Sequence, residues 1–153
     1  MDEYSIQAEH LAPLIKGEMQ PLLRDYHREL RIYPHLGALD LDAIEQLQAA
    51  LETAGVMHSA TVRHGDELIG FASLLIQPHT QFGMVYAQSH ALYIDPARRR
   101  GRLALRLVEF MEQLARKQGA QVIAWGTKFG TPAARLFALR GYHVQDVIYS
   151  KEL

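Results

Sequence analysis

The most informative stretch of the sequence runs from Leu92 to Leu107 and reads LYIDPARRRGRLALRL. It opens with apolar, β-prone residues, and Pro96 ends such a strand because proline has no amide hydrogen to donate to a sheet. A turn that contains four arginines within five residues follows, and the apolar residues after Gly101 recur at helical spacing. The pattern predicts a strand, a tight basic turn and an amphipathic helix.

This arrangement creates a site for an anion. The first turn of a helix has amide hydrogens without partners in the helix and carries a partial positive charge, so a diphosphate can bind there. Gly101 allows a ligand to approach the backbone closely, and the arginines strengthen the positive field. The alternative interpretation is an ordinary solvated loop, because basic runs are common on protein surfaces.

The charge distribution along the chain favours an anionic ligand in the same region. The chain of 153 residues has a net charge of −1, which does not indicate a polyanionic partner. Residues 1–97 carry 5 basic and 13 acidic side chains, whereas residues 98–153 carry 11 basic and 4 acidic side chains. Because aromatic residues do not alternate with the basic ones, we expect no nucleic-acid binding.

The composition excludes several other classes of protein. The length fits a single domain over residues 1–153. The absence of a long apolar run and of a basic, secretory N-terminus predicts a cytoplasmic protein that does not bind membranes. There is no cysteine, which excludes disulfides and cysteine nucleophiles. His64, His79 and His90 lack the paired spacing of metal ligands, so we expect no metal.

The rest of the sequence alternates between strand-like and helical patterns. Strands are predicted over residues 5–8, 59–63, 68–77, 84–94, 122–125 and 142–150. Helices are predicted over residues 11–30, 41–54 and 132–139, and from the basic turn to Gly119. Pro21 should break the first helix, Asp42 and Glu45 should cap the second, and Gly65 should turn the chain between antiparallel strands. This order predicts an α/β (α+β) fold with a mixed sheet.

The basic turn and its flanking elements resemble the signature of the GNAT (Gcn5-related N-acetyltransferase) superfamily. That signature is Val-x-Pro, then Arg/Gln-x-x-Gly-x-Gly/Ala at the start of a long helix. Residues 94–96 (Ile-Asp-Pro) match the Val-x-Pro part of the signature. Arg99 and Ala104 match the first and last positions of the Arg/Gln-x-x-Gly-x-Gly/Ala part. Gly101 then lies one residue early, and Arg102 stands where glycine is usual. The irregularity leaves the phosphate contacts of individual amides open.

A second alignment of the signature starts at Arg98, which places Gly101 correctly and leaves Leu103 as the mismatch. The resemblance covers nearly the whole chain, because residues 122–142 follow the family's order of strand, helix and Gly-Tyr junction. Residues 26–30 and 149–151 are similar to a single-domain subgroup of bacteria and their phages.

The resemblance implies a mostly antiparallel sheet that splays at an acetyl-CoA site, flanked by about four helices. It implies direct transfer of an acetyl group from acetyl-CoA to a primary amine of a small molecule or a protein, in a ternary complex. The strand residues Leu92, Tyr93 and Ile94 would bind the pantetheine arm through their backbone. The residues predicted at the pyrophosphate are Arg99, Arg100, Gly101, Arg102, Leu103 and Ala104.

Within this resemblance, His90 is the main candidate for the base that accepts the amine proton, because imidazole titrates near neutral pH. His79 in the preceding loop and Glu29 are further candidates. Gln88 should face the same side of the strand as His90 and could contact the acceptor. The alternative is that these are structural or surface residues.

The proton donor to the leaving thiolate is an open question. Many family members carry a tyrosine where this chain has Phe137, which has no proton to donate. Tyr142 is the candidate replacement, with Tyr149 or water as alternatives. Trp125 is interpreted as a core residue. The substitution at 137 also leaves open a non-catalytic CoA-binding or interaction module, and residues 142–150 could form a homodimer through an edge strand.

Overall fold

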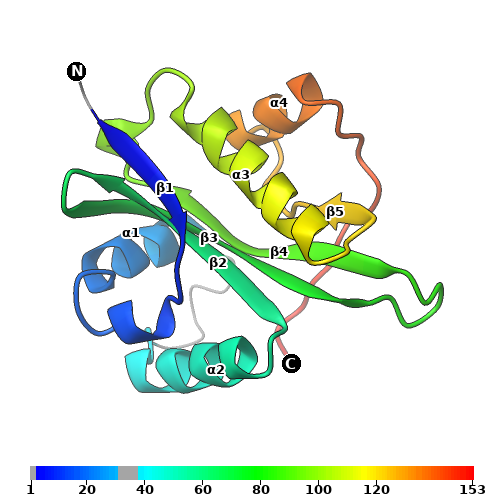
Figure 1. Cartoon of the computed structure of the whole chain (residues 1–153), viewed down its shortest axis with the longest axis horizontal. Coiled ribbons are helices and arrows are strands. Elements are labelled where there is room, and N and C mark those ends of the chain that lie inside the picture. Colours follow the sequence, from blue (N-terminus) through cyan, green and yellow to red (C-terminus); the bar gives the residue numbers. More distant parts are fainter. Residues whose placement is uncertain (1–2, 31–37) are drawn as a thin grey trace.

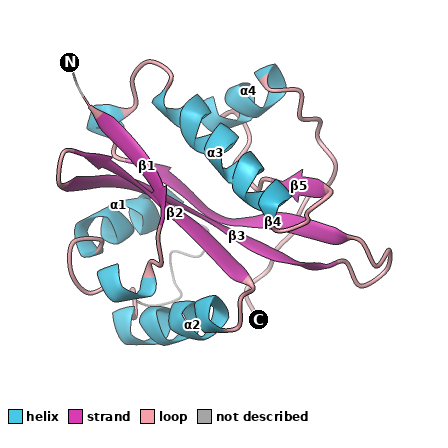
Figure 2. Ribbon diagram, in the orientation of Figure 1, coloured by secondary structure: helices cyan, strands magenta, loops and turns pink. Residues whose placement is uncertain are grey.

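The computed structural model describes residues 3–30 and 38–153, in which one five-stranded sheet has helices on both faces (Figure 1, Figure 2). The strands, in spatial order, are β1 (Tyr4–Ala8), β2 (Met57–His64), β3 (Glu67–Pro78), β4 (Val85–Ile94) and β5 (Val122–Ala124). The helices are α1 (Gln20–Leu30), α2 (Leu41–Thr53), α3 (Leu103–Lys117) and α4 (Pro132–Leu139), with short 3-10 turns η1 (Ala12–Leu14) and η2 (Pro96–Arg98). Neighbours from β1 to β4 are antiparallel, and β5 is parallel to β4. The predicted mixed fold is confirmed.

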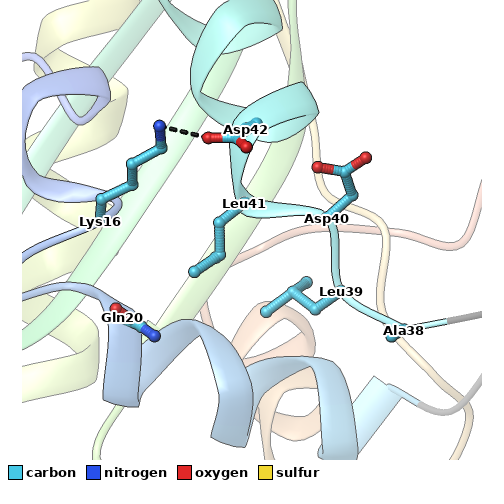
Figure 3. A pocket seen from close by; sticks show the side chains of 7 residues that line it. All are labelled: Lys16, Gln20, Ala38, Leu39, Asp40, Leu41 and Asp42. Atoms are coloured by element: carbon cyan, nitrogen blue, oxygen red, sulfur yellow. Dashed lines mark ion pairs between the residues drawn. The ribbon is translucent and has the colours of Figure 1, made fainter.

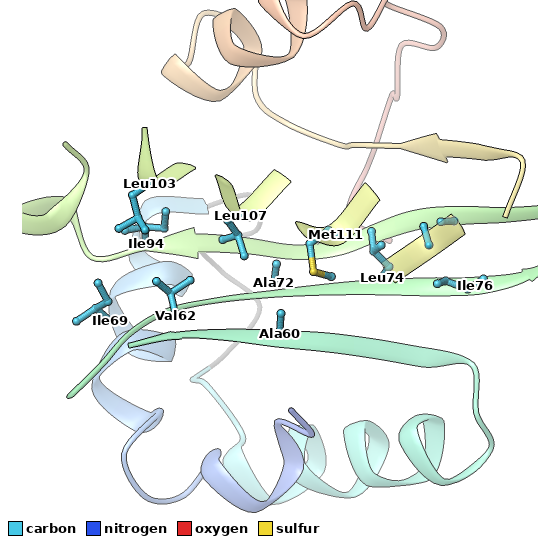
Figure 4. Packing of buried hydrophobic residues seen from close by; sticks show 12 residues of the cluster. Ala60, Val62, Ile69, Ala72, Leu74, Ile76, Ile94, Leu103, Leu107 and Met111 are labelled. Atoms are coloured by element: carbon cyan, nitrogen blue, oxygen red, sulfur yellow. The ribbon is translucent and has the colours of Figure 1, made fainter. Parts of the chain in front are cut away.

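One face of the sheet packs against α3. Leu103, Leu107 and Met111 of this helix point at the sheet (Figure 4) and are almost completely buried. Small residues on the strands, including Ala60 and Ala72, let the helix approach closely. This packing fixes the N-terminus of α3 beside the end of β4.

The opposite face holds η1 and α1 against β3 and β4. Tyr26 of α1 makes edge contacts with Phe71 of β3 and Tyr93 of β4, at ring-centroid distances of 5.6 and 5.7 Å. Leu11 and Ile15 complete this cluster. The aromatic contacts place the C-terminal end of α1 beside β4, where the candidate site lies.

Two details of the helices differ from the predictions. Pro21 lies in the first turn of α1 and does not break it, because a first-turn residue needs no amide hydrogen; the interruption comes earlier, between η1 and Gln20. The cap of α2 is Asp40, whose Oδ1 accepts from the Ala43 amide at 3.0 Å, while Asp42 forms an ion pair with Lys16. In the described ranges, no helix is long and apolar enough to cross a membrane.

The predicted last strand is wrong. Residues 143–153 are exposed and form neither helix nor strand, and they follow α4 past β5 (red in Figure 1). A strand needs a neighbour for its amides and carbonyls, and no strand among the described residues pairs with this segment. Apolar, β-prone composition alone was therefore insufficient.

Candidate functional site

A cavity of about 430 Å³ lies where the ends of α1, α3 and α4 meet β4 and the loop after β5. The predicted site residues that line it are His90, Glu29, Leu92, Tyr93, Ile94, Arg99, Arg100, Gly101 and Ala104. Tyr142, Arg102 and Leu103 do not line it. The fold thus gathers three segments that are far apart in the sequence around one space.

The cavity forms because β4 and β5 separate. Their parallel pairing ends at Gln88 and Ala124, although β4 continues to Ile94. Just beyond the last pair, the Gly126 amide donates to Ser89 Oγ at 2.8 Å, so a side chain takes the place of the next backbone bond. β5 therefore does not cover the backbone of β4 beyond Gln88.

His90 is the extra residue of a β-bulge in β4. Ser73 of β3 pairs with Ala91, and the next residue, Leu74, pairs with Ser89, which leaves His90 without a partner in the register. The imidazole lines the cavity, and surrounding protein atoms that displace water lower the pKa of His90 below its ordinary value. The ring is therefore neutral at neutral pH and able to accept a proton.

The start of α3 offers unpaired amides to the cavity. Among the described residues, the amides of positions 101–105 have no hydrogen-bond acceptor, whereas the Arg106 amide donates to the Arg102 carbonyl at 2.9 Å. Gly101 turns the chain with a φ of +60°, a conformation in which a side chain would be strained. The arrangement is suited to an anion with several oxygens.

The arginines of the basic turn have different partners. Arg98 forms an ion pair with Glu67 at 3.3 Å. Arg99 donates from Nε to the Ile94 carbonyl at 2.6 Å and from Nη2 to Glu29 at 2.7 Å. The Arg100 side chain has no ion pair or hydrogen bond with any described residue, and it lines the cavity. Arg100 is therefore the guanidinium best placed to meet a phosphate.

Tyr142 belongs to a polar cluster beside α3 and not to the cavity. Its hydroxyl donates to Glu112 at 2.8 Å and accepts from Trp125 Nε1 at 3.0 Å. Burial is the main cause that raises the pKa of Tyr142 to about 12. Phe137 lines the cavity, and it stacks on Trp125 at 5.4 Å and contacts the Tyr142 ring at 5.3 Å. This packing agrees with a core role for Trp125.

His79 and Gln88 also lie outside the cavity lining. His79 lies in the loop between β3 and β4, where it packs against Phe82 of the loop and Tyr86 of β4. Its Nδ1 accepts from the Gln81 amide at 3.2 Å. Gln88 accepts from the Tyr86 hydroxyl at 2.7 Å. The geometry gives neither residue a role in the site.

Sequence reasoning missed three polar residues of the cavity wall, which are Ser89, Lys128 and Thr131. Lys128 Nζ donates to the Glu29 carbonyl at 3.2 Å, which connects the loop after β5 to α1. Thr131 caps α4, because its hydroxyl accepts from the Ala134 amide at 3.3 Å. A cap faces the open end of its helix, and this signal could have suggested a site there.

A second, more open hollow of about 680 Å³ lies at the start of α2 (Figure 3). Its charged groups are already engaged, because Lys16 is paired with Asp42 and Asp40 caps the helix. Within the described residues, no group of three or more His, Asp or Glu side chains is arranged to hold a metal ion. We therefore place the site in the cavity beside β4.

Comparison with known proteins gives one family match and several structural matches. The family model described as Acetyltransferase (GNAT) family matches residues 19–142. No curated protein matches the sequence. A ribosomal-protein-alanine N-acetyltransferase from Brucella melitensis biovar Abortus 2308 has a similar structure, with a TM-score of 0.73 and 16% identity over 99% of both chains.

Two other solved structures are similar to the chain at comparable scores. An aminoglycoside acetyltransferase from an uncultured soil metagenomic sample has a TM-score of 0.75 and 12% identity, over 98% of this chain and 96% of that one. Glucosamine-6-phosphate N-acetyltransferase from Arabidopsis thaliana has a TM-score of 0.72 and 12% identity over 99% of both chains. At such low identity these structures show a shared fold, while their named substrates differ.

Proposed function

Because the chain belongs to the GNAT acetyltransferase family, we propose that it transfers an acetyl group from acetyl-CoA to a primary amine of a small molecule or a protein. One observation supports this proposal above the others. Among the residues that the structure describes, the amides of residues 101–105 and the guanidinium of Arg100 have no partner, and they lie at one end of a cavity that His90 also lines. A single space therefore holds both a phosphate-binding end and a basic side chain.

The residues present fit acetyl-CoA. The amides at the start of α3 and Arg100 would hold the pyrophosphate, because backbone donors and a guanidinium both complement phosphate oxygens. The backbone of β4 beyond its last pair with β5 would hold the pantetheine arm, and the Ile94 carbonyl at its end already accepts from Arg99. When bound, acetyl-CoA supplies the activated acetyl group, and the protein orients the two substrates and surrounds them with polar groups.

Neutral His90 would accept the proton that the amine loses as it attacks the thioester. It is well placed for this role, since the bulge in β4 leaves its ring at the cavity wall. Glu29 is less suited, because both of its carboxylate oxygens accept from Arg99. We therefore assign Glu29 to the positioning of α1 and keep His90 as the proposed base.

A second candidate is a CoA-binding module without turnover. Phe137 favours it, because this residue stands at the cavity wall without a proton to donate, and Tyr142 is engaged with Glu112. The two candidates share the cavity and differ in chemistry. Binding alone cannot distinguish them, but product formation can.

Calorimetric titration with acetyl-CoA, CoA and ATP is the first test. We expect binding of both CoA species that Arg100→Gln weakens, and weaker binding of ATP. A screen of amines follows, with free CoA measured by its thiol, since the chain has no cysteine to contribute a background signal. Binding of acetyl-CoA without release of free CoA in the presence of any amine would favour the module. Failure to bind CoA would overturn both candidates.

A further inference from the structure

One lysine of the chain lies in the wall of the cavity beside β4. The sequence has four lysines, all within the described ranges, which are Lys16, Lys117, Lys128 and Lys151, and of these Lys128 lines the cavity. Lys16 is paired with Asp42 in the separate hollow at the start of α2. Lys117 ends α3, and Lys151 lies in the exposed segment after α4. A primary amine therefore lies in the space where acetyl transfer is proposed.

The amine of Lys128 is held at the cavity by a neutral acceptor. Its Nζ donates to the Glu29 carbonyl at 3.2 Å. The carboxylate of Glu29 is engaged elsewhere, because both of its oxygens accept from Arg99. Among the described residues, no carboxylate forms an ion pair with Lys128. The amine can therefore leave its acceptor without breaking an ion pair, which is the stronger kind of contact.

The backbone of Lys128 is fixed close to the proposed base. The Gly126 amide donates to Ser89 Oγ at 2.8 Å, and Ser89 directly precedes His90 in β4. The Thr131 hydroxyl donates to the Lys128 carbonyl at 2.9 Å. Two residues span at most about 7 Å, so the lysine side chain begins near the part of β4 that carries His90. Its flexible four-carbon stem can turn toward β4 while the loop stays in place.

We propose that Lys128 is an internal acceptor, so that the protein transfers an acetyl group from acetyl-CoA to Nζ of its own Lys128. The inference rests on the proposed function and names one amine for it. Three observations at one place support it. The amine lines the cavity, its acceptor is a neutral carbonyl, and its loop is bonded to the strand that carries His90.

The transfer needs no reactant besides acetyl-CoA. Because Lys128 is exposed at the cavity mouth, its ammonium can lose one proton to water. Nζ then attacks the thioester carbon, so that a C–N bond forms and the C–S bond breaks. His90 accepts the second proton that Nζ loses, and this proton passes through water to the leaving thiolate. The products are an amide at Lys128 and free CoA.

The modification would change the wall of the cavity. Acetylation removes the positive charge of Lys128 and enlarges its side chain. The Glu29 carbonyl would lose its charged donor, and with it the contact that connects the loop after β5 to α1. A modified chain therefore presents a less charged wall to the next amine.

Mass spectrometry of the full chain, incubated with acetyl-CoA and no added amine, tests the inference. We expect a gain of one acetyl group, and a tryptic peptide that spans residues 118–135, because trypsin does not cleave after acetyl-lysine. Lys128 should be labelled at least about tenfold faster than Lys117 or Lys151, since its amine is held in the cavity. The rate per chain should not vary with protein concentration, because the transfer is internal.

Variants separate this transfer from chemical acetylation of exposed lysines. Lys128→Arg should abolish the gain in mass, whereas Lys117→Arg, outside the cavity, should leave it unchanged. His90→Gln should reduce the labelling of Lys128 to the rate of Lys151. Equal labelling of all lysines in the unmodified sequence, or a rate per chain that rises with concentration, overturns the inference.

Calorimetry distinguishes the failure of this inference from the failure of the proposed function. If acetyl-CoA binds and Lys128 stays unlabelled, the internal transfer alone is overturned, and acetylation of an added amine can still be measured. If acetyl-CoA does not bind, the proposed function and the internal transfer are both overturned.

Discussion

Arg99 donates from Nη2 to both carboxylate oxygens of Glu29, at 2.7 and 2.9 Å, and so joins the basic turn to α1 beside the cavity. The same guanidinium donates from Nε to the Ile94 carbonyl and lies 5.3 Å from the centre of the Tyr93 ring. The sequence predicts a phosphate ligand at this position. In the structure most donors of Arg99 are engaged, so positioning of α1 is the role that the geometry supports.

For the ion pair between Arg99 and Glu29 we expect a small coupling free energy in a double-mutant cycle. Arg99→Gln, Glu29→Gln and the double variant should give a coupling below about 1 kcal/mol in the free energy of unfolding, because both side chains are well exposed. Affinity for acetyl-CoA should change little in Arg99→Gln. Denaturant titration and calorimetry provide the two measurements. A loss of affinity equal to that of Arg100→Gln would restore Arg99 as a phosphate ligand.

Replacing Arg100 should weaken the binding of CoA, whereas replacing Arg99 should not. Arg100→Gln removes a charged donor from the phosphate end, so affinity for CoA should fall by about tenfold or more, with little change in stability. The salt dependence of binding should weaken as well, because one charge interaction is lost. Arg116→Gln, an exposed change near the end of α3, serves as the control. Equal affinities for the two variants would contradict the assignment.

The pH dependence of turnover tests His90. The pKa of His90 lies below the ordinary 6.5, so the imidazole stays neutral until the pH falls through that lowered value. Turnover should therefore persist down to the same pH and fall below it. His90→Gln should reduce turnover by about 100-fold at neutral pH and by less at high pH, where the amine is already deprotonated. His79→Gln is the matched control outside the cavity. A ratio that does not vary with pH would remove His90 from the mechanism.

Tyr142→Phe should affect stability and not chemistry. The change deletes the bonds to Glu112 and Trp125, so unfolding should become easier by about 1–2 kcal/mol while turnover is retained. The sign of the pH effect follows from a folded pKa of about 12 against an ordinary 10. The stabilisation that Tyr142 gives to the folded state is therefore complete below pH 10 and is lost as the pH rises toward 12.

Equilibrium unfolding at pH 8 and at increasing alkaline pH would measure this loss, using Tyr149→Phe as the control because Tyr149 is 92% exposed. Tyr93, whose pKa burial also raises to about 12, contributes in both variants and cancels in the comparison. If Tyr142→Phe abolished turnover in a stable protein, the catalytic role predicted from the sequence would return.

Most local elements were predictable because their signals are local. Gly65 has a φ of +58° in the turn between β2 and β3, and Thr131 caps α4 with its own hydroxyl. The strand, turn and helix around Gly101 likewise depend on neighbouring residues. Residues 142–150 were not predictable in this way, since a strand exists only where a second backbone lies beside it.

The sequence was sufficient for the fold class, because glycine, proline and apolar spacing act on residues close in the chain. Its resemblance to the GNAT signature was sufficient for the family, and the same stretch predicts where an anion would bind. The partners of the charged side chains required the tertiary structure. Arg99 meets Glu29 across 70 positions, and Tyr142 meets Glu112 across 30. No spacing rule covers such distances, since only the packing of α1, α3 and α4 around β4 determines which arginine of the cavity wall has no partner among the described residues and which histidine lines the cavity.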